Sequence, residues 1–301
     1  GYDRPYAAAA VAASSCLGVI IPPSITMVIY GTTANVSVGR LLIGGFLPGL
    51  LLSALLLLIN SYTAKRSNFP AASTKVPRSE VWKSFKEAFW ALLMPVIILG
   101  GIMTGIFTPT ESSCIAVVYG LIIGFFVYKE LSVKELLPIF YKSAINTGMI
   151  VLLIAAAGPF GWLLTINQAP AIITGFLLSI TTNPAVLYAI VLVLYLILGT
   201  FMETTGIIML VVPILAPVMS QLGVDPVHFG VVTVCALATG MATPPVGIAL
   251  FTTCGIANVS LAEISRKVWP FIIAMVIGLF ILAYVPIITT ILPDLVMGKG
   301  R

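Results

Sequence analysis

Charged side chains are scarce in this sequence. They make up 8% of its 301 residues, whereas hydrophobic residues make up 59%. A water-soluble domain carries about 25% charged residues, so the deficit excludes an ordinary soluble protein. The hydrophobic residues form continuous runs rather than an alternating pattern, which favours membrane-spanning helices over a barrel. The sequence therefore predicts an all-α membrane protein.

The residues that usually hold metals or perform covalent catalysis are also scarce. The four cysteines (Cys16, Cys114, Cys235 and Cys254) include no CxxC pair and lie in apolar segments, where we interpret them as small packing residues. The single histidine, His228, is predicted to lie at the membrane interface and not to bind a metal or carry protons. An intramembrane hydrolase is disfavoured, because no nucleophile has a base in reach and no paired carboxylates occur.

The net charge of +5 arises largely from one polar loop. Six basic residues gather there: Lys65, Arg66, Lys75, Arg78, Lys83 and Lys86. Positive loops face the cytoplasm in membrane proteins, so this loop is expected to be cytoplasmic. The charges lack interleaved aromatic residues, so no nucleic-acid partner is expected.

Apolar segments long enough to enter a bilayer recur along the chain. The first, 6–21, breaks at Pro22-Pro23 and resumes over 24–31. Further segments are expected at 41–62, 88–105, 114–128, 144–164, 185–199 and 269–292, with a separate amphipathic stretch at 82–87 and a segment at 170–180 that is too short to cross. Several of these pieces are too broken for simple crossings.

The sequence contains an internal repeat. The stretch GYDRPYAAAAVAASSCLGVIIPPSITMVIYGTTANVS aligns with GVDPVHFGVVTVCALATGMATPPVGIALFTTCGIANVS, which starts at Gly223. The alignment pairs Gly18 with Gly240 and Pro22-Pro23 with Pro244-Pro245, and after one inserted residue it pairs the two ANVS motifs. The two stretches are therefore copies.

Charge indicates that the two copies point in opposite directions. Arg40 precedes a span that ends at the basic loop, so it is expected outside, whereas Arg266 and Lys267 follow the second copy and are expected inside. Inverted repeats with broken helices are typical of secondary transporters, which bind substrate and coupling ion near the bilayer midplane.

The duplicated proline pair predicts a cation site. Proline has no N–H and displaces the carbonyl four residues earlier, so each pair leaves main-chain oxygens without partners in an apolar setting. Sodium prefers oxygen ligands of this kind, together with hydroxyls. The predicted sodium-binding residues are Ser14, Gly18, Ile21 and Pro22 in the first copy, and Gly199, Thr200, Thr205, Gly240, Thr243 and Pro244 around the second.

Polar residues near the breaks are candidates for substrate contact: Ser15, Ser24, Asn35, Glu203 and Asn258. Glu203 is alone in an apolar setting, where a carboxylate is costly, so binding a cation and relaying a proton are further candidate roles. It is equally well explained as a cap of the next helix. The two asparagines are at least as well explained as helix terminators.

Three further acidic residues have structural explanations. Glu111 in FTPTESS is expected to lie in the first turn of a helix that Thr108 or Thr110 caps. Asp3 and Asp225 open the two repeat copies and are expected to cap helices at the membrane surface.

Five motifs together resemble one family, the large membrane (M, or DctM-like) subunit of tripartite ATP-independent periplasmic (TRAP) transporters. They are GYDRPYAAA, IIPPSITMVIYG, GIFTPTESS, GTFMETTGIIMLVVPILAPV and GMATPPVGIALF, and they are spread over almost the whole chain. Such a protein lies in the bacterial inner membrane and is not an enzyme.

The resemblance implies an inverted-repeat elevator fold of the ion-transporter superfamily, with re-entrant hairpins and broken helices. It implies sodium-driven uptake of an organic acid, such as a sialic acid or a C4-dicarboxylate, with no cofactor besides the coupling Na⁺. A periplasmic substrate-binding protein and a small membrane (Q) subunit are the implied partners.

The implied domains are transport-domain segments at 1–40 and 146–265, with scaffold segments at 41–145 and 266–301. The family has a Gly/Ser-rich hairpin before GYDRP, and this chain begins at Gly1 without a visible signal peptide. We therefore expect an N-terminal part of the subunit to be missing and the first sodium site to be incomplete.

Two other classes of transport protein were considered. A dicarboxylate/sodium symporter of the same superfamily that needs no binding protein is the nearest alternative. An ion channel is disfavoured, because channels use rings of like groups, usually formed by oligomers, rather than inverted repeats.

Overall fold

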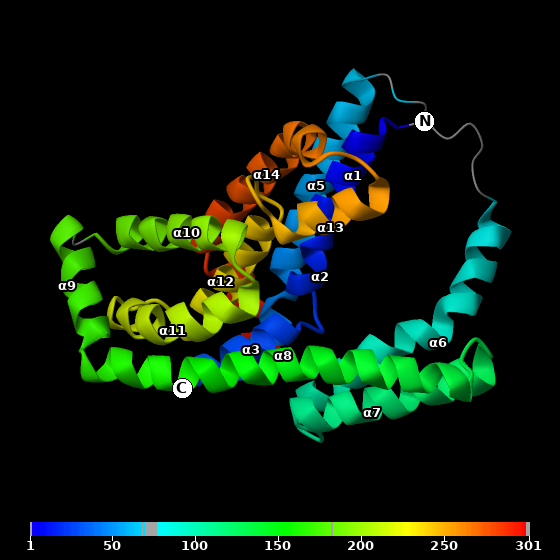
Figure 1. Ribbon diagram of the computed structural model, residues 1–301, viewed down its shortest axis with the longest axis horizontal. Helices are drawn as coiled ribbons and strands as arrows, with labels where there is room; N and C mark the ends of the chain where they lie inside the picture. Colours follow the sequence, from blue (N-terminus) through cyan, green and yellow to red (C-terminus); the bar gives the residue numbers. More distant parts are fainter. Residues whose placement is uncertain (1, 68, 70–76, 182, 299–301) are drawn as a thin grey trace. The chain divides into compact units, whose positions relative to one another are not determined.

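A computed structural model of the chain describes residues 2–67, 69, 77–181 and 183–298 (Figure 1). Gly1 of the first repeat copy and Lys75 of the predicted basic loop lie outside the described residues. Every regular element within the described ranges is helical.

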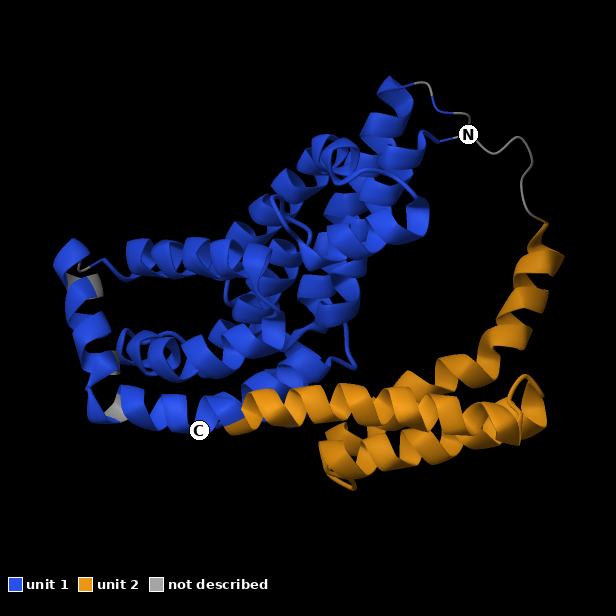
Figure 2. Ribbon diagram, viewed as in Figure 1, with its two compact units in different colours: residues 1–69, 156–301 blue, residues 70–155 orange. Residues whose placement is uncertain are grey.

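Contacts divide the chain into two compact units (Figure 2), one formed by Gly1–Phe69 with Ala156–Arg301 and the other by Pro70–Ala155. The first unit contains α1 (Arg4–Ser15), α2 (Leu17–Ile20), α3 (Ile25–Ala34), α4 (Val38–Gly44), α5 (Phe46–Arg66), α9 (Ala169–Ile180), α10 (Pro184–Phe201), α11 (Thr204–Gln221), α12 (Pro226–Met241), α13 (Ile248–Ala257), α14 (Leu261–Tyr284) and α15 (Ile287–Met297). The second unit contains α6 (Arg78–Met103), α7 (Pro109–Ile122) and the π-helix η1 (Ile123–Val127). The long helix α8 (Val133–Ile166) has residues in both ranges.

The prediction of an all-α membrane protein is confirmed. Among the described residues, seven helical segments are long and apolar enough to cross a bilayer, and the bent pair formed by α1–α2 and α3 makes an eighth candidate. The helix direction bends by 46° between the two parts of this pair, at the predicted Pro22-Pro23 break.

Two predicted boundaries were wrong. The last span does not run through 269–292, because α14 ends at Tyr284 and α15 begins at Ile287, with Pro286 between them. Proline 286 cannot donate the main-chain bond that a continuous helix needs at this point. The stretches 82–87 and 88–105 are not separate, because α6 runs without interruption from Arg78 to Met103.

Helix α12 forms the core of the first unit. Every residue from Val227 to Gly240 is buried. Its neighbours are α2, α3, α4, α10, α11, α13, α14 and α15. Small residues permit this close packing: a Cβ at Gly230 would lie 2.5 Å from the Tyr30 ring. The second repeat copy therefore supplies the central helix around which the first unit is built.

Each repeat copy has a first arm before its proline pair and a second arm after it, and the first arm of each copy packs on the second arm of the other. The first arm of copy one, α1, packs on the second arm of copy two, α13, while the first arm of copy two, α12, packs on α3. Each copy's following helix continues the pattern, since α1 packs on α14 and α12 packs on α4. Antiparallel broken helices give this arrangement, in agreement with the inverted repeat read from the sequence.

The ANVS motif makes the same corner in both copies. Asn35 ends α3 and Asn258 ends α13, each with positive φ (54° and 51°), a conformation that asparagine tolerates better than most residues. Two residues later, Ser37 and Ser260 accept hydrogen bonds from the first turns of α4 and α14. The motif therefore terminates one helix and starts the next.

Two ion pairs of the first unit join residues near the N- and C-terminal ends of the chain to other segments. Arg40 pairs with Asp294 of α15, and Lys267 of α14 lies 3.6 Å from Asp3. The prediction that Asp3 caps α1 was wrong for its side chain, which makes no capping bond. The prediction for Asp225 is confirmed, because its carboxylate accepts the N–H of His228 at 2.9 Å.

His228 is buried among helices, and its predicted position at the membrane interface stays a prediction. Its side chain is 1% exposed. Its Nδ1 lies 2.7 Å from the Thr289 hydroxyl, and its Nε2 lies 3.1 Å from the Ala283 carbonyl and 3.3 Å from the Tyr188 hydroxyl. A buried polar group is stable only when it is hydrogen-bonded, and His228 joins α10 and α12 to α14 and α15 in this way.

Helix α7 begins as predicted. Thr108 accepts the N–H of Glu111, and the Glu111 carboxylate accepts the Thr108 N–H at 2.8 Å, which forms a capping box. The four cysteines are free thiols, and Cys16 and Cys235 are buried, as the packing interpretation requires. Cys114 is exposed in the second unit, so the packing interpretation fails for it within this chain.

Replacing Gly240 by alanine tests the close approach of α10 and α12. The added Cβ would lie 2.8 Å from Cα of Gly199 and 2.9 Å from the Leu196 carbonyl oxygen, so the two helices must separate. We expect a loss of about 1–3 kcal/mol of stability, measured as a lower Tm of the purified protein. Gly255→Ala is the matched control, because nothing lies within 4 Å of its Cβ position and alanine favours helix. Equal Tm values for the two variants would contradict the packing argument.

Candidate functional site

Both proline pairs interrupt a helix in the same way. The peptide bonds Pro22-Pro23 and Pro244-Pro245 are cis. In the first copy α2 ends at Ile20 and α3 begins at Ile25, and in the second copy α12 ends at Met241 and α13 begins at Ile248. The predicted helix breaks are therefore present at both positions.

The tip of the α10–α11 hairpin packs against the second break. The Thr200 carbonyl accepts the N–H of Gly247 at 3.0 Å, and the Thr204 hydroxyl lies 3.0 Å from the sulfur of Met241. Gly199 approaches Gly240 so closely that neither position has room for a side chain. Three of the predicted sodium-site residues, Gly199, Thr200 and Gly240, are thus brought together.

The hydroxyl hydrogens of three predicted ligands are already engaged within the protein. Thr200 donates to the Ile197 carbonyl at 2.7 Å, Thr243 donates to the Thr239 carbonyl at 2.9 Å, and Thr205 donates to Glu203 at 3.0 Å. A hydroxyl that has donated its hydrogen offers only lone pairs to any further partner. These oxygens are therefore suited to a cation and cannot donate to an anion.

Neutral oxygens dominate the region around the second break. In the described part of the chain, no three His, Cys, Asp or Glu side chains gather closely enough to hold a metal ion. The N–H groups of Thr243 and Gly247 bond to the carbonyls of Gly240 and Thr200, so main-chain contacts already join the break to the hairpin tip. Any cation here would be held mainly by carbonyl and hydroxyl oxygens.

The first break is closed by Ser24. Its hydroxyl donates to the Val19 carbonyl and accepts the Met27 N–H at 3.2 Å, so this side chain links α2 to α3 across the break. Just before the break, α2 packs on α12, so the two repeat copies contact each other beside the first break.

The two breaks differ in their surroundings. Gly240 is buried against α10, whereas its counterpart Gly18 is exposed and has nothing within 4 Å of its Cβ position. Ser14 and Ser15 are exposed on the same stretch, and Ser15 donates to the Ala12 carbonyl at 2.7 Å. Within the described residues, no hairpin packs on the first break as α10 and α11 pack on the second.

Glu203 caps α11. One carboxylate oxygen accepts the N–H groups of Thr205 and Gly206 at 2.7 and 3.2 Å, and the other accepts the Thr205 hydroxyl. This geometry gives Glu203 a structural role at the positive end of the helix. Its predicted contact with substrate stays a prediction.

The two asparagines do not lie at the breaks. Asn35 and Asn258 are exposed at the far ends of α3 and α13, ten or more residues beyond the proline pairs. Their left-handed conformations assign them to the ANVS corners. A role of either residue in substrate contact stays a prediction.

Sequence reasoning missed Gly247 and Thr204. Gly247 has a positive φ of 52°, and a Cβ there would lie 3.0 Å from the carbonyl oxygens of both Met241 and Thr243. The signal was present, since a glycine three residues after the first proline of the pair suggests a tight backbone path. Thr204 carried no comparable signal, because its contact with Met241 depends on how two distant segments pack.

Comparisons with known proteins place these features in context. The family model for the DctM component of tripartite ATP-independent periplasmic transporters matches residues 1–288. The chain is 37% identical over 300 residues to the sialic acid TRAP transporter large permease protein SiaM of Vibrio cholerae, covering 100% of this chain and 70% of that protein. It is 37% identical over 318 residues to the C4-dicarboxylate TRAP transporter large permease protein DctM of the same organism, covering 99% of this chain and 70% of that protein.

A third relative is longer. The chain is 41% identical over 292 residues to the isethionate TRAP transporter permease protein DctMQ of Oleidesulfovibrio alaskensis, covering 96% of this chain and 45% of that protein. The chain thus spans less than half of this relative. All three relatives are named as transporter permeases, not as enzymes.

Replacing Glu203 separates capping from any further role. Glu203→Ala removes the acceptor for two N–H groups and should destabilise the first turn of α11 by about 0.5–2 kcal/mol, seen as faster hydrogen exchange at Thr205 and Gly206. Glu203→Ser is the control, because serine also caps helices and should restore slow exchange. Unchanged hydrogen exchange in the alanine variant would contradict the capping role. If the serine variant keeps slow exchange but loses transport, Glu203 has a second role besides capping.

Proposed function

The chain belongs to the DctM family of tripartite ATP-independent periplasmic transporters, and from this premise we propose that it drives uptake of an organic acid with a sodium gradient. It is a transporter subunit and a multi-pass protein of the bacterial inner membrane. The coupling ion, the substrate, the partners and the elevator movement are parts of the proposal.

The hairpin tip against the second break is the observation that supports sodium coupling most strongly. The bond from the Gly247 N–H to the Thr200 carbonyl and the bond from the Thr204 hydroxyl to the Met241 sulfur join two segments that both have interrupted backbones. Sodium bound among the Thr200, Thr243 and Thr205 oxygens would tighten this joint, since each hydroxyl offers lone pairs only. Ion binding is thereby coupled to the position of the hairpin.

A substrate anion is proposed to bind beside the sodium, at the start of α13. Helix N-termini attract anions, but Glu203 already occupies that of α11 and Ser24 caps that of α3. Gly247 is the N-cap residue of α13 and has no side chain to cap it, so the first N–H groups of the helix remain available. The relatives named for sialic acid and C4-dicarboxylates transport carboxylates, which such a position suits.

The family description names a tripartite transporter, which supports the proposal of two further components. The proposed partners are a periplasmic substrate-binding protein and a small membrane subunit. The soluble protein delivers the organic acid, and the small subunit stabilises the static part of the membrane complex.

Movement of one domain against another completes the mechanism. With sodium bound, the hairpin tip and the substrate pocket are ordered, and the loaded transport domain (1–40 and 146–265) slides across the bilayer against the scaffold (41–145 and 266–301). Without sodium the tip loosens and translocation is disfavoured. No residue of the chain forms a covalent bond to the substrate.

Uptake by the complete transporter in proteoliposomes tests the coupling. A sodium gradient should drive accumulation of the acid in the presence of the binding protein, and a proton gradient alone should not. Accumulation driven by protons without sodium would overturn sodium coupling.

The same assay tests the site. Thr200→Ala and Thr243→Ala should each raise the half-saturating sodium concentration about tenfold, the effect of losing a contact worth about 1.4 kcal/mol. Thr252→Ala is the matched control, because this exposed threonine donates to the Ile248 carbonyl in the same way but lies outside the break. Unchanged sodium dependence in the first two variants would reject the site while leaving the function intact.

A further inference from the structure

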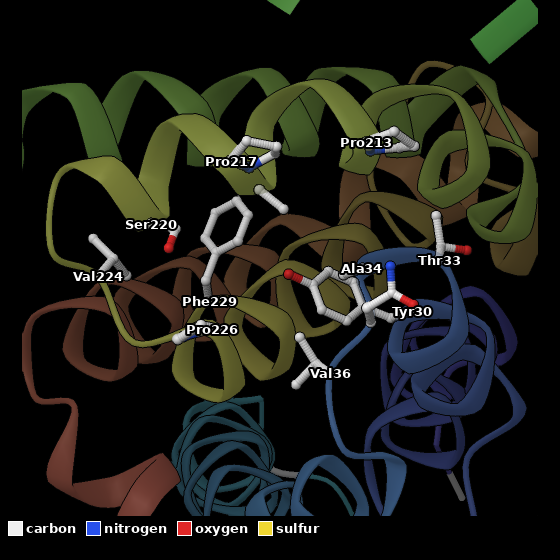
Figure 3. Close-up of a pocket in the computed structure, with 12 residues that line it drawn as sticks. Tyr30, Thr33, Ala34, Val36, Pro213, Pro217, Ser220, Val224, Pro226 and Phe229 are labelled. Carbon is white, nitrogen blue, oxygen red and sulfur yellow. The ribbon is translucent and has the colours of Figure 1, made fainter. Parts of the chain in front are cut away.

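A cavity lies where α3 and α11 end and α12 begins, and no residue of the proline pairs lines it (Figure 3). Its volume is about 370 Å³, and residues from the end of α3, the second half of α11 and the start of α12 line it. Of the predicted site residues, Asn35 alone is in its lining. Because the lining includes residues beyond the helix ends, such as Val36 and Val224, the cavity opens at the level where these helices stop.

Tyr30 supplies an unpartnered hydroxyl to this cavity. Its side chain is 0% exposed, and its hydroxyl has no hydrogen-bond partner. The ring is held against Gly230, where a Cβ would lie 2.5 and 2.9 Å from ring carbons. Figure 3 shows the hydroxyl directed across the cavity toward the side of Phe229. A buried hydroxyl without a partner costs about 1–3 kcal/mol, so a ligand that bonds to it gains accordingly.

Main-chain acceptors are in excess around the cavity. Pro213 and Pro217 both line it and are four residues apart, so the Pro213 carbonyl cannot receive the usual helical N–H. The last carbonyls of α3 lack helical partners, apart from that of Gly31, which accepts from Asn35 and Val36. These main-chain acceptors favour a ligand that donates hydrogen bonds.

The electrostatics favour a cation. The C-terminal ends of α3 and α11 both border the cavity, and each carries the negative end of a helix dipole. The nearby N-terminus of α12 is already occupied by its own carboxylate, Asp225. None of the lining residues is charged, so nothing there would neutralise the organic acid of the proposed function.

The size and the apolar lining favour an organic cation over a bare metal ion. A metal ion would fill only a small part of this volume and would leave the rings of Phe229, Pro213 and Pro217 without contacts. An alkylammonium group fits both features, because its N–H groups meet the acceptors and its carbons meet the rings. Aromatic rings also attract such groups through cation–π contacts.

We propose that this cavity binds an organic ammonium group, supplied either by the headgroup of phosphatidylethanolamine or by a small free amine. The ammonium group lies between the Tyr30 hydroxyl, the Pro213 carbonyl and the last carbonyls of α3. This site is separate from the proline breaks and does not depend on sodium.

Native mass spectrometry and thermal shift of the purified, delipidated complex test the proposal. The probes are short-chain phosphatidylethanolamine, short-chain phosphatidylglycerol and free ethanolamine. Binding of phosphatidylethanolamine alone identifies a lipid headgroup site, and binding of ethanolamine as well identifies a small-amine site. Equal binding of phosphatidylglycerol, which has no ammonium group, or no binding of either amine probe, would overturn the proposal.

Two pairs of variants locate the site. Tyr30→Phe should weaken amine binding about tenfold, the loss expected for a hydrogen bond to a charged group. Tyr195→Phe should leave binding unchanged, because its hydroxyl is equally buried and unpartnered but is not in the lining. Equal binding by both would reject the role of Tyr30.

Ser220→Lys places a tethered ammonium at the cavity and should abolish binding of the probe. Gln221→Lys is its control, because this exposed neighbour adds the same charge outside the lining. Both lysines lie at exposed positions that tolerate substitution, so this pair tests the location of the site even if a tyrosine variant fails to fold. Equal loss of binding in both lysine variants would indicate a general charge effect and reject the site.

Discussion

An unpartnered main-chain group in an apolar environment costs several kcal/mol, and the arrangement of this protein follows from that cost. Two proline pairs release carbonyls in the middle of apolar helices, so neighbouring segments must satisfy or use them. At the second break the Gly247 N–H donates to the Thr200 carbonyl, which joins the interruption to the hairpin tip. At the first break the protein uses Ser24, whose hydroxyl bonds to both sides of the interruption.

Close approach of backbones makes this arrangement possible. Gly199 and Gly240 let α10 and α12 touch main chain to main chain, and Gly230 gives the same freedom to the Tyr30 ring. In lipid, where apolar surface drives helices together only weakly, such contacts and interhelical hydrogen bonds carry the association. The contacts of His228 with Thr289 and Ala283 are such interhelical hydrogen bonds. The central position of α12 therefore depends on its small residues as much as on its hydrophobicity.

The sequence predicted most of the fold and part of the candidate site. The break at Pro22-Pro23, the repeat, and the capping box at Thr108 were recognisable because proline, glycine and capping residues act on the backbone within a few residues. The ion pair of Asp3 and the burial of His228 were not predicted, for the opposite reason. Asp3 pairs with Lys267 and His228 contacts Thr289, and neither partner is near in sequence.

The sequence by itself determined the helical class, the two copies and the positions of their interruptions, since hydrophobic length and backbone chemistry are local properties. Tertiary structure alone decided that the copies exchange arms, that Thr204 meets Met241, and that the Tyr30 hydroxyl is left without a partner in a cavity. Burial and hydrogen bonding of a side chain depend on segments far away along the chain. Such environments exist only once the helices have packed.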